Sequence, residues 1–348
     1  MAVEPFLGTR AQRSFIGIIC LQAVAVLAII SVVFGMIANH VDLSLANYKT
    51  VPCYLALFVL AELFELLMAF DALRLRNVIQ LAGILLFHVA LVVFSTIQIH
   101  ETKVALVRTA NCDYTVDYVT CGGSGTLYRQ VVHLLIAVPA IIAAAWVVMI
   151  FFVRALYFEF GWAVFRIVGA NPAMKTMYQF YEVLICLLKF DFFAFTGVTI
   201  QLLIVVLSKN STEFGLTIAA IPVVLVLLVG CGLSAQREIK PLMAFSLFLM
   251  LASETYFIYK LVRFYEPASE AQYETTRATL TVFTIVSILL LLTTFGVGLR
   301  CFLDFGKGLY ESKTSDNLLQ AKRRSKYKGT EEKPDSPGYP LQPRLSIE

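Results

Sequence analysis

The chain has 348 residues, of which 59% are hydrophobic and only 15% are charged, and its mean hydropathy is +0.77. A water-soluble protein carries charge on about a quarter of its residues, so this composition excludes soluble secreted, cytosolic and nucleic-acid-binding proteins. The net charge of +4 does not indicate a basic binding surface, because the basic residues are concentrated after Leu299. We therefore expect the lipid bilayer to be the partner of this chain, with no nucleic acid bound.

Apolar stretches long enough to cross a bilayer recur along the chain. A hydrocarbon core of about 30 Å requires roughly 20 residues of apolar helix. Eight stretches meet that length: Ser14–Ile37, Val51–Phe70, Val78–Ile99, Val131–Val153, Val183–Leu207, Phe214–Ala235, Leu242–Val262 and Thr279–Leu299. Strands of a membrane β-barrel are shorter and alternate in polarity, whereas these stretches are continuous. The sequence predicts an all-α, polytopic membrane protein with eight transmembrane helices.

The positions of Lys and Arg predict which side of the membrane is cytoplasmic. Cytoplasmic segments near helix ends are enriched in these residues. Basic residues precede the first stretch and follow the second, fourth, sixth and eighth, all of which lie on one side if every stretch crosses. We expect both termini in the cytoplasm and residues 100–130 in a lumenal loop. An oxidising lumen permits a disulfide between Cys112 and Cys121 in this loop, and two free thiols are the alternative.

The composition changes near Ser312. The segment 312–348 is rich in Lys, Ser, Pro, Glu and Gly, and residues 322–328 form a basic run. Such a segment does not bury enough apolar surface to fold alone. We therefore expect an eight-span membrane domain over residues 1–311 and a disordered cytoplasmic tail over 312–348. The basic run is expected either to bind anionic lipid or trafficking machinery, or only to be solvated and enforce the topology.

The sequence contains no recognisable catalytic or metal-binding pattern. Gly122-Gly123-Ser124-Gly125 has the form of an intramembrane serine-protease nucleophile, but it lies in the predicted loop, and the last four stretches contain no histidine to act as a base. The four histidines are not spaced as zinc ligands. We expect no enzyme activity, no cofactor and no metal site.

Ionisable residues inside the predicted spans are the main candidates for function, because charge is costly in lipid. They are Glu62, Glu65, His88, Lys189, Asp191 and Glu254. Glu62, His88 and Glu254 fall near the middle of their stretches, and we expect them to share one polar cavity that holds a proton. The structural alternative is that these groups only join helices to one another, with Lys189 neutralising a carboxylate on a neighbouring helix.

Residues 154–181, between the fourth and fifth stretches, are too charged and interrupted to cross the bilayer. Their aromatic residues are typical of the membrane interface. Asn171-Pro172 predicts a break into two short helices, which we expect to dock under the bundle. Glu159, Trp162 and Arg166 are the candidate contact residues of this interfacial segment.

Three motifs in and beside this segment resemble a known family. They are Glu159-Phe160-Gly161-Trp162, Met174-Lys175-x-Met177-Tyr178 and the run Leu187–Phe193, and they are similar to the signature of a fungal family of uncharacterised multi-pass Golgi apparatus membrane proteins. The resemblance implies a Golgi location and no activity. We expect a Golgi membrane protein with a transport or trafficking role. The alternative is a seven-helix receptor-like signalling protein, in which one stretch does not span. Nothing in the sequence indicates an oligomeric state.

Overall fold

The computed structural model describes residues 7–43, 48, 50–109, 112–168, 171–205, 212–266, 277–308 and 310. Within these residues, eight helices are long and apolar enough to cross a membrane. The same residues contain no β-strand, only an isolated bridge between Thr109 and Cys121. The predicted class is confirmed: the chain is a polytopic helical protein that lies in a lipid bilayer. The tail 312–348, with its basic run 322–328, lies outside the described residues.

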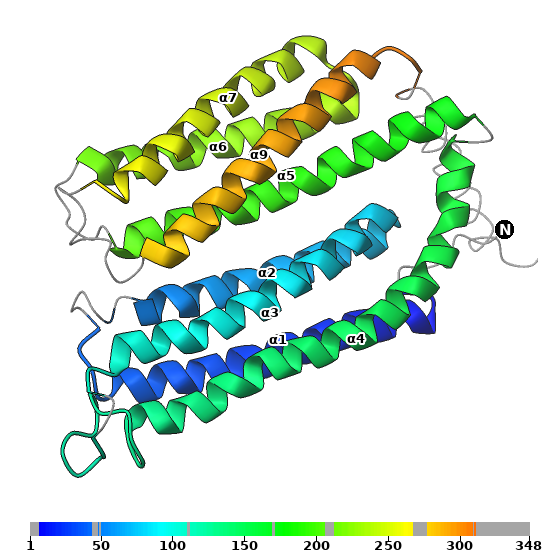
Figure 1. The fold of residues 1–348 in the computed structure, drawn as a ribbon. Coiled ribbons are helices and arrows are strands. Elements are labelled where there is room, and N and C mark those ends of the chain that lie inside the picture. The colour runs from blue at the N-terminus through cyan, green and yellow to red at the C-terminus, as the bar shows by residue number, and fades with distance from the viewer. Residues whose placement is uncertain are drawn as a thin grey trace, which may run out of the picture.

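The helices run roughly alongside one another (Figure 1). In chain order they are α1 (Arg10–Ala38), α2 (Thr50–Leu75), α3 (Val78–Leu106), α4 (Leu127–Val168), α5 (Pro172–Val205), α6 (Thr212–Arg237), α7 (Lys240–Arg263) and α9 (Arg277–Asp304). Each helix contains all or most of one of the apolar stretches predicted from the sequence. The helices generally extend beyond those stretches, because polar residues past the hydrocarbon core still satisfy the helical hydrogen bonds.

The helices form two groups of four. Helices α1 to α4 surround one hydrophobic core, which includes Phe15 and Leu81, and helices α5, α6, α7 and α9 surround a second, which includes Leu184 and Met250. In each group every helix packs against the next along the chain, and the first packs against the last. Figure 1 shows the first group below the second. Each group therefore repeats the same closed four-helix arrangement.

The two groups meet mainly where α5 packs against α2 and α3. Phe64 and Phe87 of the first group contact Phe190 and Phe193 of α5, with ring centroids 4.9 to 6.0 Å apart. A Cβ atom at Gly83 of α3 would lie 3.0 Å from both the Cys186 Sγ and the Phe190 ring. A larger residue at this position would therefore force the Cys186 and Phe190 side chains to shift, and glycine allows α3 and α5 to approach closely without that shift.

The sequence predicted that the interfacial segment 154–181 forms two separate short helices, and the structure shows that this is wrong. α4 continues to Val168, and α5 begins at Pro172. The break lies at the predicted place: Asn171 caps α5 by accepting a 3.0 Å hydrogen bond from the Ala173 backbone N–H, and Pro172 occupies the first turn, where its missing N–H is not needed. Between Val153 and Val168 no residue breaks the helix, so both flanks are extensions of spanning helices.

Figure 1 shows the last part of α4 turning across the end of the bundle towards α5. This part of α4 thus connects the two helix groups at the end where α1 begins. The side chains of Trp162 and Arg166 lie outside the described residues, so their predicted contacts remain predictions.

Candidate intramembrane polar sites

A buried polar cluster joins three helices of the first group. It consists of Gln22 on α1, Glu62 and Glu65 on α2, and His88 on α3, and none of the four side chains is more than 2% exposed. We call these residues the Gln22 cluster. The Gln22 amide nitrogen donates to Glu62 Oε2 at 3.4 Å and to Glu65 Oε2 at 3.3 Å. Gln22 Oε1 lies 2.7 Å from His88 Nε2. The Gln22 amide therefore connects the two carboxyl groups to the imidazole.

The local sequence explains why these side chains meet. Glu62 and Glu65 are three residues apart and so lie on one face of α2. At 1.5 Å per helical residue, Glu65 and His88 each lie about 15 Å from the ends of α2 and α3 that are joined by a short turn, and Gln22 lies about 18 Å from the start of α1. The cluster is thus held at one depth, well inside the apolar part of the bundle.

The contact between His88 and Glu65 defines the chemistry of the cluster. His88 Nδ1 lies 3.0 Å from Glu65 Oε1. Because Nε2 donates to Gln22 Oε1, Nδ1 of a neutral imidazole carries a lone pair, and it would repel an ionised carboxylate at this distance. A proton on Glu65 or on an imidazolium would remove this repulsion; neither Glu65 Oε1 nor His88 Nδ1 has a hydrogen-bond partner among the described residues. The cluster thus places two carboxyl groups and an imidazole together among buried residues of the first helix group.

Glu254 does not join Glu62 and His88, contrary to the expectation of one shared cavity. Glu254 lies on α7, which packs against α6 and α9 in the second group, and its carboxylate has no hydrogen-bond partner among the described residues. Similar depth predicted that the three residues would converge. Depth does not determine which helices pack together, and the two separate cores place Glu254 apart from the Gln22 cluster.

Asp191 lies in the second helix group and is 6% exposed. Thr294 of α9 donates a 2.6 Å hydrogen bond to Asp191 Oδ2. Asp191 therefore faces α9 and not the Gln22 cluster. Lys189 is only two residues away along α5, but its side chain contacts α2 and α3 and not α9.

Lys189 joins the two groups. Its ammonium donates to the Asp71 carboxylate of α2 and, at 2.9 Å, to Gln80 Oε1 of α3. The side chains of Lys189 and Asp71 are 28% and 34% exposed. This pair matches the structural alternative, in which Lys189 neutralises a carboxylate on another helix.

Sequence reasoning missed Gln22, Asp71, Gln80 and Thr294. Gln22 is an amide inside an otherwise apolar stretch and carries no ionisable group, which was the signal used for the candidates. Asp71 directly follows the predicted end of the second stretch, although α2 continues to Leu75. A candidate set that included amides, and one further helical turn at each end of a span, would have contained Gln22, Asp71 and Gln80. It would not have contained Thr294, because threonines are common in spans and give no signal.

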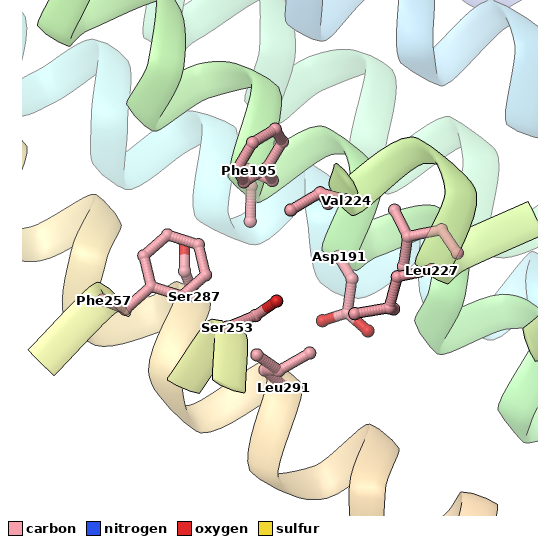
Figure 2. Close-up of a pocket in the computed structure, with 10 residues that line it drawn as sticks. Asp191, Phe195, Val224, Leu227, Ser253, Phe257, Ser287 and Leu291 are labelled. Carbon is pink, nitrogen blue, oxygen red and sulfur yellow. The ribbon is translucent and has the colours of Figure 1, made fainter. Parts of the chain in front are cut away.

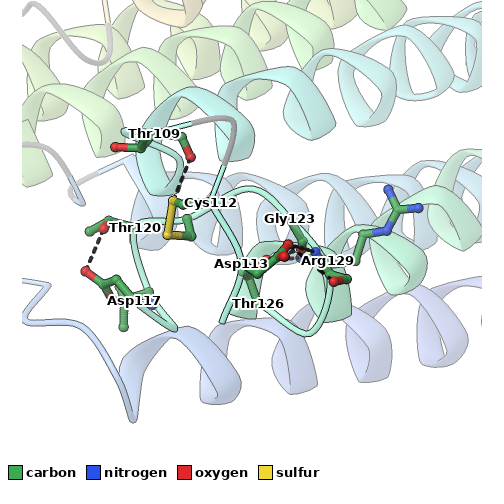
Figure 3. The surroundings of a disulfide bond; sticks show 11 residues. Thr109, Cys112, Asp113, Asp117, Thr120, Gly123, Thr126 and Arg129 are labelled. Atoms are coloured by element: carbon green, nitrogen blue, oxygen red, sulfur yellow. Dashed lines mark hydrogen bonds between the residues drawn. A yellow bond between two sulfur atoms is a disulfide. The ribbon is translucent and has the colours of Figure 1, made fainter. Parts of the chain in front are cut away.

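The loop between α3 and α4 contains a disulfide that joins Cys112 to Cys121, with a Cα–Cα distance of 5.2 Å (Figure 3). Asp117 accepts hydrogen bonds from the Thr120 hydroxyl at 2.6 Å and from the Val119 backbone N–H at 2.9 Å. These bonds stabilise the ionised form and lower the pKa of Asp117. The Ser124 hydroxyl donates to Asp113 Oδ1 at 3.3 Å. This serine therefore makes a hydrogen bond within the loop.

Glu159, near the end of α4, contacts the start of α1. Thr9 Oγ1 caps α1 by accepting from the Gln12 backbone N–H at 3.3 Å and donates to Glu159 Oε2 at 3.1 Å. The Gln12 amide donates to the other oxygen of Glu159. Glu159 therefore holds the first turn of α1 against α4.

Over 88% of its length the chain is 28% identical to a UPF0658 Golgi apparatus membrane protein of Schizosaccharomyces pombe, and the match covers 91% of that protein. That name describes a location and no reaction. No family model and no solved structure matches the chain. The likeness over nearly the whole length supports the family resemblance seen in the motifs, and nothing supports the seven-helix receptor alternative. The chain is accordingly a multi-pass membrane protein that is similar over most of its length to an uncharacterised Golgi apparatus membrane protein.

Proposed function

We propose that the protein transports protons across the Golgi membrane through the Gln22 cluster. The observation that carries this proposal is the fully buried contact between His88 Nδ1 and Glu65 Oε1, 3.0 Å apart. An imidazole and a carboxyl group that share one proton exchange it without separating full charges over a distance. Ionisable groups of this kind inside a membrane are typical of proton relays.

Glu62 supplies a second proton-accepting group in the same cluster. Its Oε2 accepts from Gln22, and its Oε1 has no hydrogen-bond partner among the described residues. A proton that leaves the Glu65–His88 pair thus has an acceptor three residues along the same helix. Because Gln22 donates to both carboxyl groups, it stabilises the ionised form of either one while the other is protonated.

We propose further that both termini are cytoplasmic and that the disulfide-bonded loop is lumenal. The disulfide-bonded loop and the start of α1 lie at opposite ends of the bundle in Figure 1, and a disulfide between Cys112 and Cys121 suits an oxidising compartment. The basic residues before α1 and in the tail agree with this orientation. With this orientation the basic run 322–328 faces the cytoplasmic leaflet, whose anionic lipid attracts such runs.

The test is proton flux into liposomes that contain the purified full-length protein and an internal pH-sensitive dye. A pH gradient is imposed, and K⁺ with valinomycin compensates the charge. We expect flux well above that of protein-free liposomes, and at least a ten-fold lower flux for Glu65→Gln, which keeps the size of the side chain but cannot exchange a proton.

Glu254→Gln is the matched control, because it also neutralises a buried carboxylate but lies outside the Gln22 cluster. We expect it to keep the wild-type flux. Wild-type liposomes that are no more permeable to protons than empty ones, with the protein shown to be folded and monodisperse before reconstitution, would contradict the proposal. Equal flux in wild type and Glu65→Gln would also contradict it.

A further inference from the structure

The second helix group contains a small, partly open cavity of about 20 Å³. Asp191 of α5, Ser253 of α7 and Ser287 of α9 are the polar residues of its lining, and the remaining lining residues are apolar, Phe195 and Phe257 among them. Figure 2 shows these side chains around the cavity, with the Ser253 hydroxyl directed towards the Asp191 carboxyl group. The volume is sufficient for one water-sized particle.

Asp191 has unused coordinating capacity in this cavity. Its Oδ2 accepts the hydrogen bond from Thr294, while Oδ1 has no hydrogen-bond partner among the described residues, although the residue is only 6% exposed. A buried carboxylate oxygen without a partner is strongly unfavourable. Lys189, the nearest cation along α5, is bound to Asp71 on the other side of the helix. Oδ1 therefore lacks a partner among the described residues and is available to a ligand in the cavity.

The serine side chains supply neutral oxygen atoms. The Ser287 hydroxyl donates its hydrogen to the Phe283 carbonyl at 2.8 Å, so the lone pairs of its oxygen remain to accept or coordinate. Ser253 approaches the cavity from a different helix. Oxygen atoms from one carboxylate and two hydroxyl groups, presented by three helices, are the ligands that a hard cation prefers.

We propose that this cavity binds one dehydrated monovalent cation of the size of Na⁺, with Asp191 Oδ1 as the charged ligand and the oxygens of Ser253 and Ser287 as neutral ligands. One positive charge balances the one carboxylate in the lining. A divalent cation such as Mg²⁺ does not fit, because it retains several water molecules and the cavity has room for about one. The site lies in a different helix group from the Gln22 cluster and does not depend on the proposed proton transport.

The experiment measures the melting temperature of the purified full-length protein in detergent, in NaCl, KCl or choline chloride at equal ionic strength. A ligand that binds only the folded state raises the melting temperature with its concentration. We expect a saturable rise of about 3 °C in Na⁺ at ten times the dissociation constant, a smaller rise in K⁺ and none in choline. Asp191→Asn should abolish the difference between Na⁺ and choline.

Glu65→Gln is the matched control and should keep the full Na⁺ response, whatever its effect on proton flux. Identical melting temperatures in Na⁺ and choline, as expected for a cavity that holds water, would overturn the proposal, and so would a full Na⁺ response in Asp191→Asn. If Asp191→Asn does not fold, Ser253→Ala and Ser287→Ala decide: each should raise the half-saturating Na⁺ concentration about three-fold or more, and unchanged values in both would overturn the proposal.

Discussion

Lys189 of α5 and Asp71 of α2, 118 residues apart in the chain, form an ion pair that joins the two helix groups. Gln80 of α3 accepts a second hydrogen bond from the same ammonium and donates from its own amide to the Met68 carbonyl. Near this polar contact, phenylalanine rings of α2 and α3 pack against those of α5, and these rings have no charge to set their register. The ion pair therefore adds a directional polar contact between α5 and the helices α2 and α3.

Lys189→Met should lower the free energy of unfolding by about 1–2 kcal/mol. Exposed ion pairs contribute about 0–1 kcal/mol and removal of one partner of a buried pair costs about 3–5 kcal/mol, and this pair is about one-third exposed. Thermal unfolding in detergent measures the change. In the double variant Asp71→Asn, Lys189→Met, the two losses should be less than additive. Lys307→Met is the control, because Lys307 pairs with Asp304 but is 54% exposed, and it should have almost no effect.

Gln22→Leu should destabilise the protein by about 1–3 kcal/mol, because it leaves both carboxyl groups and the imidazole of the cluster without the amide that connects them. It should also lower the proton flux to the level of Glu65→Gln. Gln98→Leu is the control: Gln98 is also a buried glutamine, and its Oε1 has no hydrogen-bond partner among the described residues. A Gln22→Leu protein with wild-type stability and flux would show that the cluster does not need the amide.

Alkylation should distinguish the disulfide cysteines from the others. In the denatured, unreduced protein we expect five of the seven cysteines to react, and all seven after reduction. Replacing Cys112 and Cys121 by Ser should lower the free energy of unfolding by about 2–3 kcal/mol at most, because the closed loop is short and restricts the unfolded chain only modestly. Mass spectrometry of the alkylated protein counts the labels, and seven labels before reduction would contradict the disulfide.

Glu159→Ala should release the first turn of α1. The carboxylate accepts hydrogen bonds from Thr9 and Gln12, and loss of a contact at a helix start allows the end to fray. We expect trypsin to cleave after Arg10 and Arg13 at least about three-fold faster than in the wild type, with the rate following the population of the opened end. Tyr157→Ala, at an exposed position on the same turn of α4, should leave the cleavage rate unchanged.

The sequence by itself determined the features that depend on residues close together along the chain. Eight apolar stretches of sufficient length identified eight spanning helices, because a helix in lipid must satisfy its own backbone and present apolar side chains throughout. Asn171-Pro172 located the junction of α4 and α5, because proline restricts the residue before it and suits the first turn of a helix. The lengths of the helices that flank this junction were underestimated, since hydropathy reports the thickness of the hydrocarbon and not where helical hydrogen bonds end.

Only the tertiary structure decided which polar side chains meet. Glu62, His88 and Glu254 have similar depths in the sequence, yet Glu62 and His88 lie with Gln22 in one helix group and Glu254 lies in the other. A helical period assigns each residue a face and a depth, but the neighbour of that face depends on how whole helices pack. That packing is the sum of many weak apolar contacts between distant segments, which no local pattern in the chain encodes.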